Sequence, residues 1–254
     1  MPRIALRLAY DGTGYCGWQT QPSRQSLQDA LEAALASIAG EPVQVVCAGR
    51  TDAGVHALSQ VVHFDTEALR PLSAWVKGVN HCLSQHHEHK GSGGIGQMMV
   101  RHAQVTSEAF HARFSASARR YFYVIYNNED WHPLWINRSG FYYRKIDVSA
   151  MREAAAILLG RHDFSAFRAA ECQAKSPIRT IESLSIRADS PFVIVQVQAD
   201  GFLHHMIRNM VGALLAIACG DEPVHRMRDW LDSADRRLLP ASFAASGLYF
   251  AGAQ

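Results

Sequence analysis

The 254-residue sequence lacks several features that would assign it to a specialised class of protein. Its longest apolar run, residues 211–219, contains a glycine and is too short to cross a bilayer, so we expect no membrane span. The pattern of the first residues predicts a strand, and we therefore expect no signal peptide. No stretch is rich enough in proline, glycine or serine to separate independent domains.

Cysteine is scarce as well. The five cysteines are scattered and none forms a Cys-x-x-Cys pair: Cys16, Cys47, Cys82, Cys172 and Cys219. An odd number without such pairs argues against a disulfide framework and against a zinc ribbon. This usage is typical of a reducing compartment, and we predict a cytoplasmic protein.

Histidine is concentrated in one tract, without the spacing of a metal site. His86, His87 and His89 precede a glycine-rich run, and this composition predicts a loop over residues 84–96. Glu88 is the one further ligand type with suitable spacing nearby. Because a His-rich tract is only compositional evidence, we predict no metal site.

The net charge is small, but the cations are clustered. It is +2, which by itself indicates an anionic partner only weakly. From Arg101 to Arg120 there are four arginines and one glutamate, and His204, His205 and Arg208 form a second positive group. A phosphate backbone requires local patches of this kind, although either patch alone is also compatible with an ordinary solvated surface.

Apolar periodicity predicts both helices and strands. Helical spacing is found over residues 27–39, 71–83, 150–159, 203–219 and 224–233. The first helix has Ser26 as its N-cap, with Asp29 three residues on, and Gly40 ends it. Ser149 is the expected N-cap of the third helix.

The strands decide the predicted fold class. Residues 192–199 alternate, with Val193 and Val195 on one face and Gln196 on the other, and residues 121–126 form an aromatic strand. Strand and helix patterns recur in both halves. We therefore predict an α+β fold of two related α/β lobes, residues 1–105 and 106–254, sharing a mostly antiparallel central sheet with helices on one side.

One loop concentrates the residues most suited to chemistry. Arg50 and Asp52 lie between two glycines, and the apolar runs 43–47 and 61–64 predict a strand on each side. Rigid strands around a tight loop are a common way to position reactive side chains. The spacing alone is equally compatible with a surface turn that is stabilised by an aspartate–backbone hydrogen bond.

Four segments together form a specific signature. They are Tyr10-Asp11-Gly12 with Gly17-Trp18-Gln19, then Gly49-Arg50-Thr51-Asp52-Ala53-Gly54-Val55-His56, then Phe110-His111-Ala112-Arg113-Phe114-Ser115 with Arg119-Arg120-Tyr121, and last Phe202 with residues 204–212. In this order they resemble the tRNA pseudouridine synthase A family. The sequence departs from the family after Leu83, where a longer glycine-rich segment replaces a short turn and strand.

The resemblance implies a reaction and an architecture. The family isomerises uridine to pseudouridine at positions 38 to 40 of the tRNA anticodon stem-loop, with no cofactor or metal. The glycosidic bond breaks, the uracil turns, and C5 bonds to C1′. The resemblance also implies a catalytic cleft between the two lobes and a homodimer that binds tRNA across both subunits.

The resemblance further implies roles for individual residues. Asp52 is the expected nucleophile, because a carboxylate can form a covalent intermediate with the sugar C1′ or with C6 of the base. Arg208 is expected to pair with Asp52, since burial disfavours an isolated charge. Tyr121 is expected to stack on the extruded uracil and Arg50 to contact RNA or hold the base aside. The remaining cations expected to bind RNA are Arg119, Arg120, His204 and His205.

Three other functions are compatible with part of the sequence. An RNA-binding module without chemistry has the same basic patches but does not need the Arg50, Asp52, Tyr121 and Arg208 set. The Gly-x-Gly-x-x-Gly match at residues 12–17 is typical of nicotinamide-dependent enzymes, but Pro22 postpones the helix that this motif requires. A glycoside hydrolase needs a second carboxylate beside the bond, and none has a comparable context.

Overall fold

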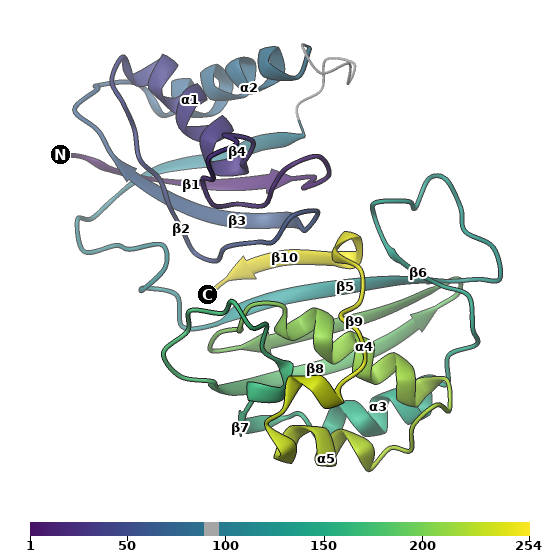
Figure 1. The fold of residues 1–254 in the computed structure, drawn as a ribbon. Helices are drawn as coiled ribbons and strands as arrows, with labels where there is room; N and C mark the ends of the chain where they lie inside the picture. Colours follow the sequence, from purple (N-terminus) through teal and green to yellow (C-terminus); the bar gives the residue numbers. More distant parts are fainter. Residues whose placement is uncertain (89–96) are drawn as a thin grey trace. The chain divides into compact units, whose positions relative to one another are not determined.

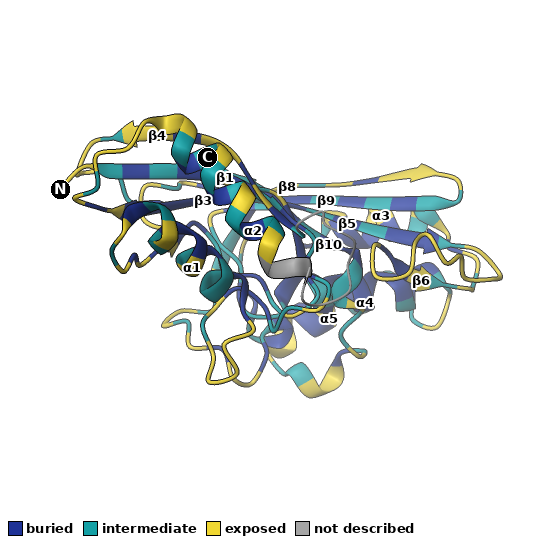
Figure 2. Ribbon diagram, turned by 90° about the horizontal axis from the view of Figure 1, so that it is seen from above, coloured by how far each residue is buried: buried dark blue, intermediate teal, exposed yellow. Residues whose placement is uncertain are grey.

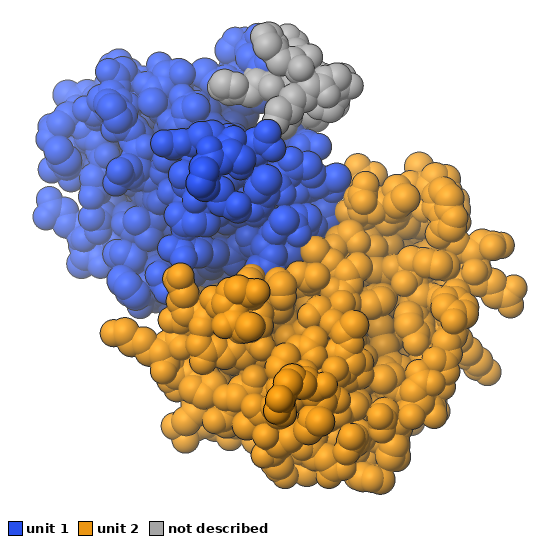
Figure 3. Space-filling view, viewed as in Figure 1, with its two compact units in different colours: residues 1–117, 250–254 blue, residues 118–249 orange. Residues whose placement is uncertain are grey.

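The fold comes from a computed structural model that describes residues 1–88 and 97–254 (Figure 1). The described residues form ten strands and five α-helices in a mostly antiparallel arrangement, which confirms the predicted α+β class. They divide into two compact units, residues 1–117 with 250–254, and residues 118–249 (Figure 3). Within the described part of the chain, no helix has the length and apolar character needed to cross a membrane.

The first unit extends beyond the boundary expected at residue 105 and includes the end of the chain. The Arg3 side chain donates to Phe110 O at 2.8 Å, which holds the segment after residue 106 against the first strand. Ser117 N donates to Gln254 O at 2.7 Å. Both contacts join residues more than a hundred positions apart, so local sequence patterns do not reveal them.

The first unit is a sheet covered on one face by two helices. Its strands lie in the order β4 (Met98–Thr106), β1 (Arg3–Tyr10), β3 (His56–Asp65) and β10 (Leu248–Ala253), and β2 (Val46–Cys47) pairs with β3. Of β10, residues 250–253 belong to this unit. The covering helices are α1 (Leu27–Ala39) and α2 (Val79–Glu88) (Figures 1 and 2). Alternate residues of β1 are buried, as expected for a strand with one covered face.

Helix α2 corrects one prediction. A π-helical turn at Ala74–Gly78 leads into it, and the helix continues to Glu88, whereas the composition predicted a loop from residue 84. The Asn80 side chain donates to Val100 O at 2.9 Å and accepts from Val100 N at 2.7 Å, which fixes α2 on β4. The rest of the predicted loop, from residue 89 to 96, lies outside the described residues.

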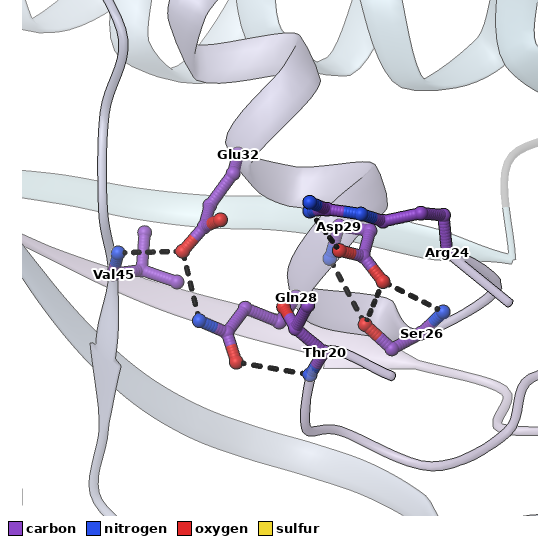
Figure 4. A network of polar contacts seen from close by, with 7 residues as sticks. All are labelled: Thr20, Arg24, Ser26, Gln28, Asp29, Glu32 and Val45. Carbon is purple, nitrogen blue, oxygen red and sulfur yellow. Dashed lines mark hydrogen bonds and ion pairs between the residues drawn. The ribbon is translucent and has the colours of Figure 1, made fainter. Parts of the chain in front are cut away.

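Helix α1 has the predicted capping box. Ser26 Oγ accepts from Asp29 N at 3.1 Å, the Asp29 carboxylate accepts from Ser26 N, and Gly40 ends the helix in the left-handed conformation. One turn further along, Glu32 Oε1 accepts from Val45 N at 3.0 Å (Figure 4). Helix α1 therefore fixes the residue that directly precedes β2.

The second unit repeats the arrangement of a sheet with helices on one face. Its antiparallel strands lie in the order β5 (Arg119–Asn127), β9 (Phe192–Ala199), β8 (Ile178–Asp189) and β7 (Gly160–Asp163), and β6 (Gly140–Tyr142) pairs with β5 in parallel. The helices are α3 (Val148–Ala156), α4 (Met206–Ala218) and α5 (Arg226–Ser233) (Figure 1).

Two sequence expectations can be checked in this unit. The alternation of β9 is confirmed, because Val193, Val195 and Val197 are buried. The N-cap of α3 was assigned wrongly. Asp147 caps it, since its Oδ1 accepts from Ser149 N at 2.8 Å and from Ala150 N at 3.1 Å. An aspartate and a serine two residues apart are both good caps, and sequence alone does not choose between them.

Candidate active site

Arg50 and Asp52 lie on the tight turn between β2 and β3 of the first unit. Val55 N donates to Asp52 O at 3.1 Å and closes the turn. Gly54 has a φ of 77°, in the left-handed region that side chains with a Cβ rarely adopt. Arg50 is exposed and Asp52 is half-buried. The turn therefore presents a carboxylate on a backbone held by strands on both sides.

A second loop of the same unit packs against this turn. A Cβ atom on Gly12 would lie 2.1 Å from Val55 O, and one on Gly17 would lie 2.9 Å from Thr51 O. Trp18 N donates to Thr51 O at 2.9 Å. These two glycines of the Gly-x-Gly-x-x-Gly match thus allow close backbone approach, and no helix begins until Leu27, so the helix that a dinucleotide site requires is missing here.

Histidine and aspartate side chains add to the contact between these two loops. The Nδ1 atom of His56 lies 3.1 Å from Asp11 Oδ1 and 3.1 Å from Gly12 N, and His56 is buried. The contact with His56 lowers the pKa of the Asp11 carboxyl well below its usual range, and hydrogen bonds from Thr13 lower it further. Asp11 is consequently ionised over the whole physiological pH range.

The first group of cations in the second unit lies at the start of β5. Tyr121 is 7% exposed, and its ring meets that of Phe202 edge to face at 5.1 Å. Arg119 Nη1 donates to Asp200 O at 3.0 Å. The Nε atom of Arg120 is buried and has no hydrogen-bond partner among the described residues. Tyr121 and Arg119 are therefore held in place by contacts within the second unit.

The second group of cations surrounds the beginning of α4. His205 precedes the helix with a φ of 62°, an unusual value for a residue other than glycine, and its ring lies 4.1 Å from that of His204. Arg208 is in the first turn, half-buried, and its Nε donates to Phe243 O at 2.9 Å. A helix N-terminus beside three potential cations favours negatively charged groups.

Comparison with known proteins identifies the family of this chain. A profile of the family described as tRNA pseudouridine synthase matches residues 8–115 and 154–254. The chain belongs to this family. A tRNA pseudouridine synthase A of Bordetella petrii is 49% identical over 251 residues, spanning 98% of this chain and 90% of the relative. One of Methylobacillus flagellatus is 48% identical over 250 residues, spanning 98% and 92%.

The family assignment establishes the type of reaction. This tRNA pseudouridine synthase is an isomerase that converts uridine in tRNA to pseudouridine, as the sequence predicted. The profile match includes the positions of Asp52 and Arg208, and Tyr121 lies between its two matched ranges. The alignments with both relatives span 98% of the chain.

Within each unit, the structure groups the predicted site residues. In the first unit, Arg50 and Asp52 share one turn. In the second unit, Arg119, Arg120 and Tyr121 share the start of β5, and His204, His205 and Arg208 share the start of α4. Phe202 connects the last two groups, because it contacts Tyr121 and precedes His204 by two residues.

Three polar residues of the first unit are buried against the turn between β2 and β3, and the sequence patterns indicate no role for them: Tyr10, Thr51 and Gln60. Tyr10 and Thr51 belong to the signature, whereas Gln60 lies outside it. The sequence signal for Gln60 is weak, because this residue lies between the polar Ser59 and the apolar Val61, and only the structure shows that it is buried.

Proposed function

We propose that this tRNA pseudouridine synthase acts on uridines 38 to 40 of the anticodon stem-loop, with Asp52 as the nucleophile. The observation that carries the proposal is the rigid turn of residues 49–55, which presents one half-buried carboxylate. Attack of that carboxylate on C1′ or C6 allows the bond between N1 and C1′ to break. The uracil then turns and C5 bonds to C1′, while the bond between Asp52 and the substrate breaks and restores the carboxylate. C5 loses a proton and N1 gains one, so no other reactant is consumed.

The other residues bind and orient the RNA in this proposal. Arg208 is the proposed ion-pair partner of the Asp52 carboxylate, because a nearby positive charge offsets the cost of burying a negative one. Tyr121, already held edge-on by Phe202, stacks on the extruded uracil, and its phenol oxygen accepts the C5 proton as its own proton leaves toward N1. Arg50 holds the base aside. Phosphates of the RNA backbone are bound by Arg119, Arg120, His204 and His205.

The uridine positions are tested with tRNA transcripts that carry tritium at uridine C5. We expect release of tritium from transcripts labelled only at position 38, 39 or 40. Transcripts labelled only in the D arm or T arm serve as controls and should release none. Release from those arms without release from positions 38 to 40 would contradict the proposed specificity. No release from any tRNA would leave an RNA-binding module as the better interpretation.

The proposal includes a homodimer and a cytoplasmic location. An apolar segment in the connection between β5 and β6 supports the dimer, because Trp131, Leu134 and Ile136 are 60%, 64% and 57% exposed. Exposed apolar patches of this kind mark interaction surfaces, and we propose that a second copy covers it. The five cysteines are free thiols, which the reducing cytoplasm maintains.

Replacing Trp131 and Leu134 by serine tests the dimer surface. We expect the dimer dissociation constant to rise at least about tenfold, because two apolar contacts would be lost. Analytical ultracentrifugation measures the change. Leu69→Ser is the matched control, since Leu69 is 84% exposed in the first unit. A monomeric wild-type protein, or a double variant that dimerises as the wild type does, would contradict this surface.

A further inference from the structure

We propose that Gln60, Tyr10 and Thr51 are positioning residues that set the Asp52 carboxylate for attack. The inference rests on the proposed role of Asp52, and it assigns a function to three side chains that do not belong to the exposed RNA-binding groups. All three are buried in the first unit, with Gln60 at 0%, Tyr10 at 4% and Thr51 at 6% exposure. They form one connected polar network directly behind the turn that carries Asp52.

Gln60 is the centre of the network. It lies on β3, and its side-chain Nε2 donates to Gly49 O at 2.6 Å and to Tyr10 OH at 3.3 Å. The amide orientation follows from these contacts, because the reverse orientation would place two carbonyl oxygens against each other at Gly49. Gln60 Oε1 is buried and has no partner among the described residues, so this amide is held by its donor end alone.

The direction of one hydrogen bond of the network follows from the donor available. The Gln60 amide nitrogen can only donate, so the Tyr10 hydroxyl oxygen accepts from it. The Tyr10 oxygen also lies 2.8 Å from Thr51 Oγ1, and either hydroxyl can donate its proton to the other. Burial raises the pKa of the Tyr10 phenol far above its usual range, so Tyr10 keeps its hydroxyl proton at all physiological pH values.

The network acts on the backbone immediately before Asp52. Gln60 fixes the carbonyl of Gly49 and Tyr10 fixes the side chain of Thr51. Thr51 is also held at its carbonyl by Trp18 N. Because the turn is fixed on the amino-terminal side of Asp52 by buried contacts, the carboxylate has little freedom to move away from the reacting carbon. Displacement of a reacting group by about 1 Å can cost about 100-fold in rate.

Isosteric variants separate positioning from simple stabilisation. Thr51→Val removes the hydroxyl and Gln60→Leu removes both donor contacts at nearly constant volume. We expect each to lower the single-turnover rate of pseudouridine formation about 10- to 100-fold, with little change in the dissociation constant for tRNA. Thr51→Ser keeps the hydroxyl and should retain a rate within about threefold of the wild type.

The readouts are the rate at saturating enzyme, tRNA affinity by filter binding, and the melting temperature. The proposal would be overturned if folded Thr51→Val and Gln60→Leu have a lower melting temperature but a wild-type rate. It would also be overturned if Thr51→Ser and Thr51→Val lose the same fraction of the rate. If Gln60→Leu does not fold, Tyr10→Phe removes a single hydroxyl and takes its place. An inactive wild type would instead count against the proposed function, so the two failures are distinguishable.

Discussion

Replacing Asp52 with asparagine is expected to abolish pseudouridine formation, lowering kcat by at least about 10⁴-fold. The amide has nearly the shape of the carboxylate but cannot form the covalent intermediate that the proposed reaction needs. The turn should survive, because its closing bond from Val55 N uses the backbone oxygen of residue 52. Tritium release from tRNA labelled at uridine C5 measures the loss, and tRNA affinity should change little.

Asp65→Asn is the matched control for this change. Asp65 is an exposed carboxylate at the other end of the ten-residue strand β3, about 33 Å along the strand from the turn. Its ion pair with Arg3 lies near the surface, so we expect activity within about twofold of the wild type and a small loss of stability. Substantial activity in the Asp52→Asn variant would remove Asp52 from the role of nucleophile.

Replacing Arg208 with lysine is expected to lower kcat about 100- to 1,000-fold, and replacing it with alanine to lower kcat further. Lysine keeps the positive charge but loses the planar group whose Nε donates to Phe243 O at 2.9 Å. The single-turnover rate should therefore decrease in the order arginine, lysine, alanine at position 208. The dissociation constant for tRNA should change less than the rate if Arg208 acts on Asp52.

Arg152→Lys provides the comparison for Arg208. Arg152 lies on α3 of the same unit, and its Nε also donates to a backbone carbonyl, that of Ile186, at 2.9 Å. The same chemical change at this exposed position should leave kcat unchanged. Equal rates for wild type and Arg208→Lys, or a loss confined to tRNA affinity, would assign Arg208 to RNA binding and not to the proposed support of Asp52.

Local chemistry in the sequence predicted much of the fold. Ser26 and Asp29 form the expected capping box, and Val193, Val195 and Val197 alternate into the core, because caps and strand faces depend on residues only a few positions apart. The two predictions that were wrong concern features that the local sequence does not decide. Asp147 competes with Ser149 as a cap, and tertiary contacts of Asn80 with β4 accompany a helix that runs beyond its expected end.

The sequence by itself determined the family, the reaction type and the candidate nucleophile, because the signature around Asp52 is contiguous and its residue types carry the chemistry. Only the tertiary structure decided what holds that residue. Gln60 contacts Gly49 and Tyr10, which lie 11 and 50 positions away, and Gly17 packs against Thr51 across a second loop. Such contacts are made when strands pair, and no local periodicity encodes the distance between side chains on different strands.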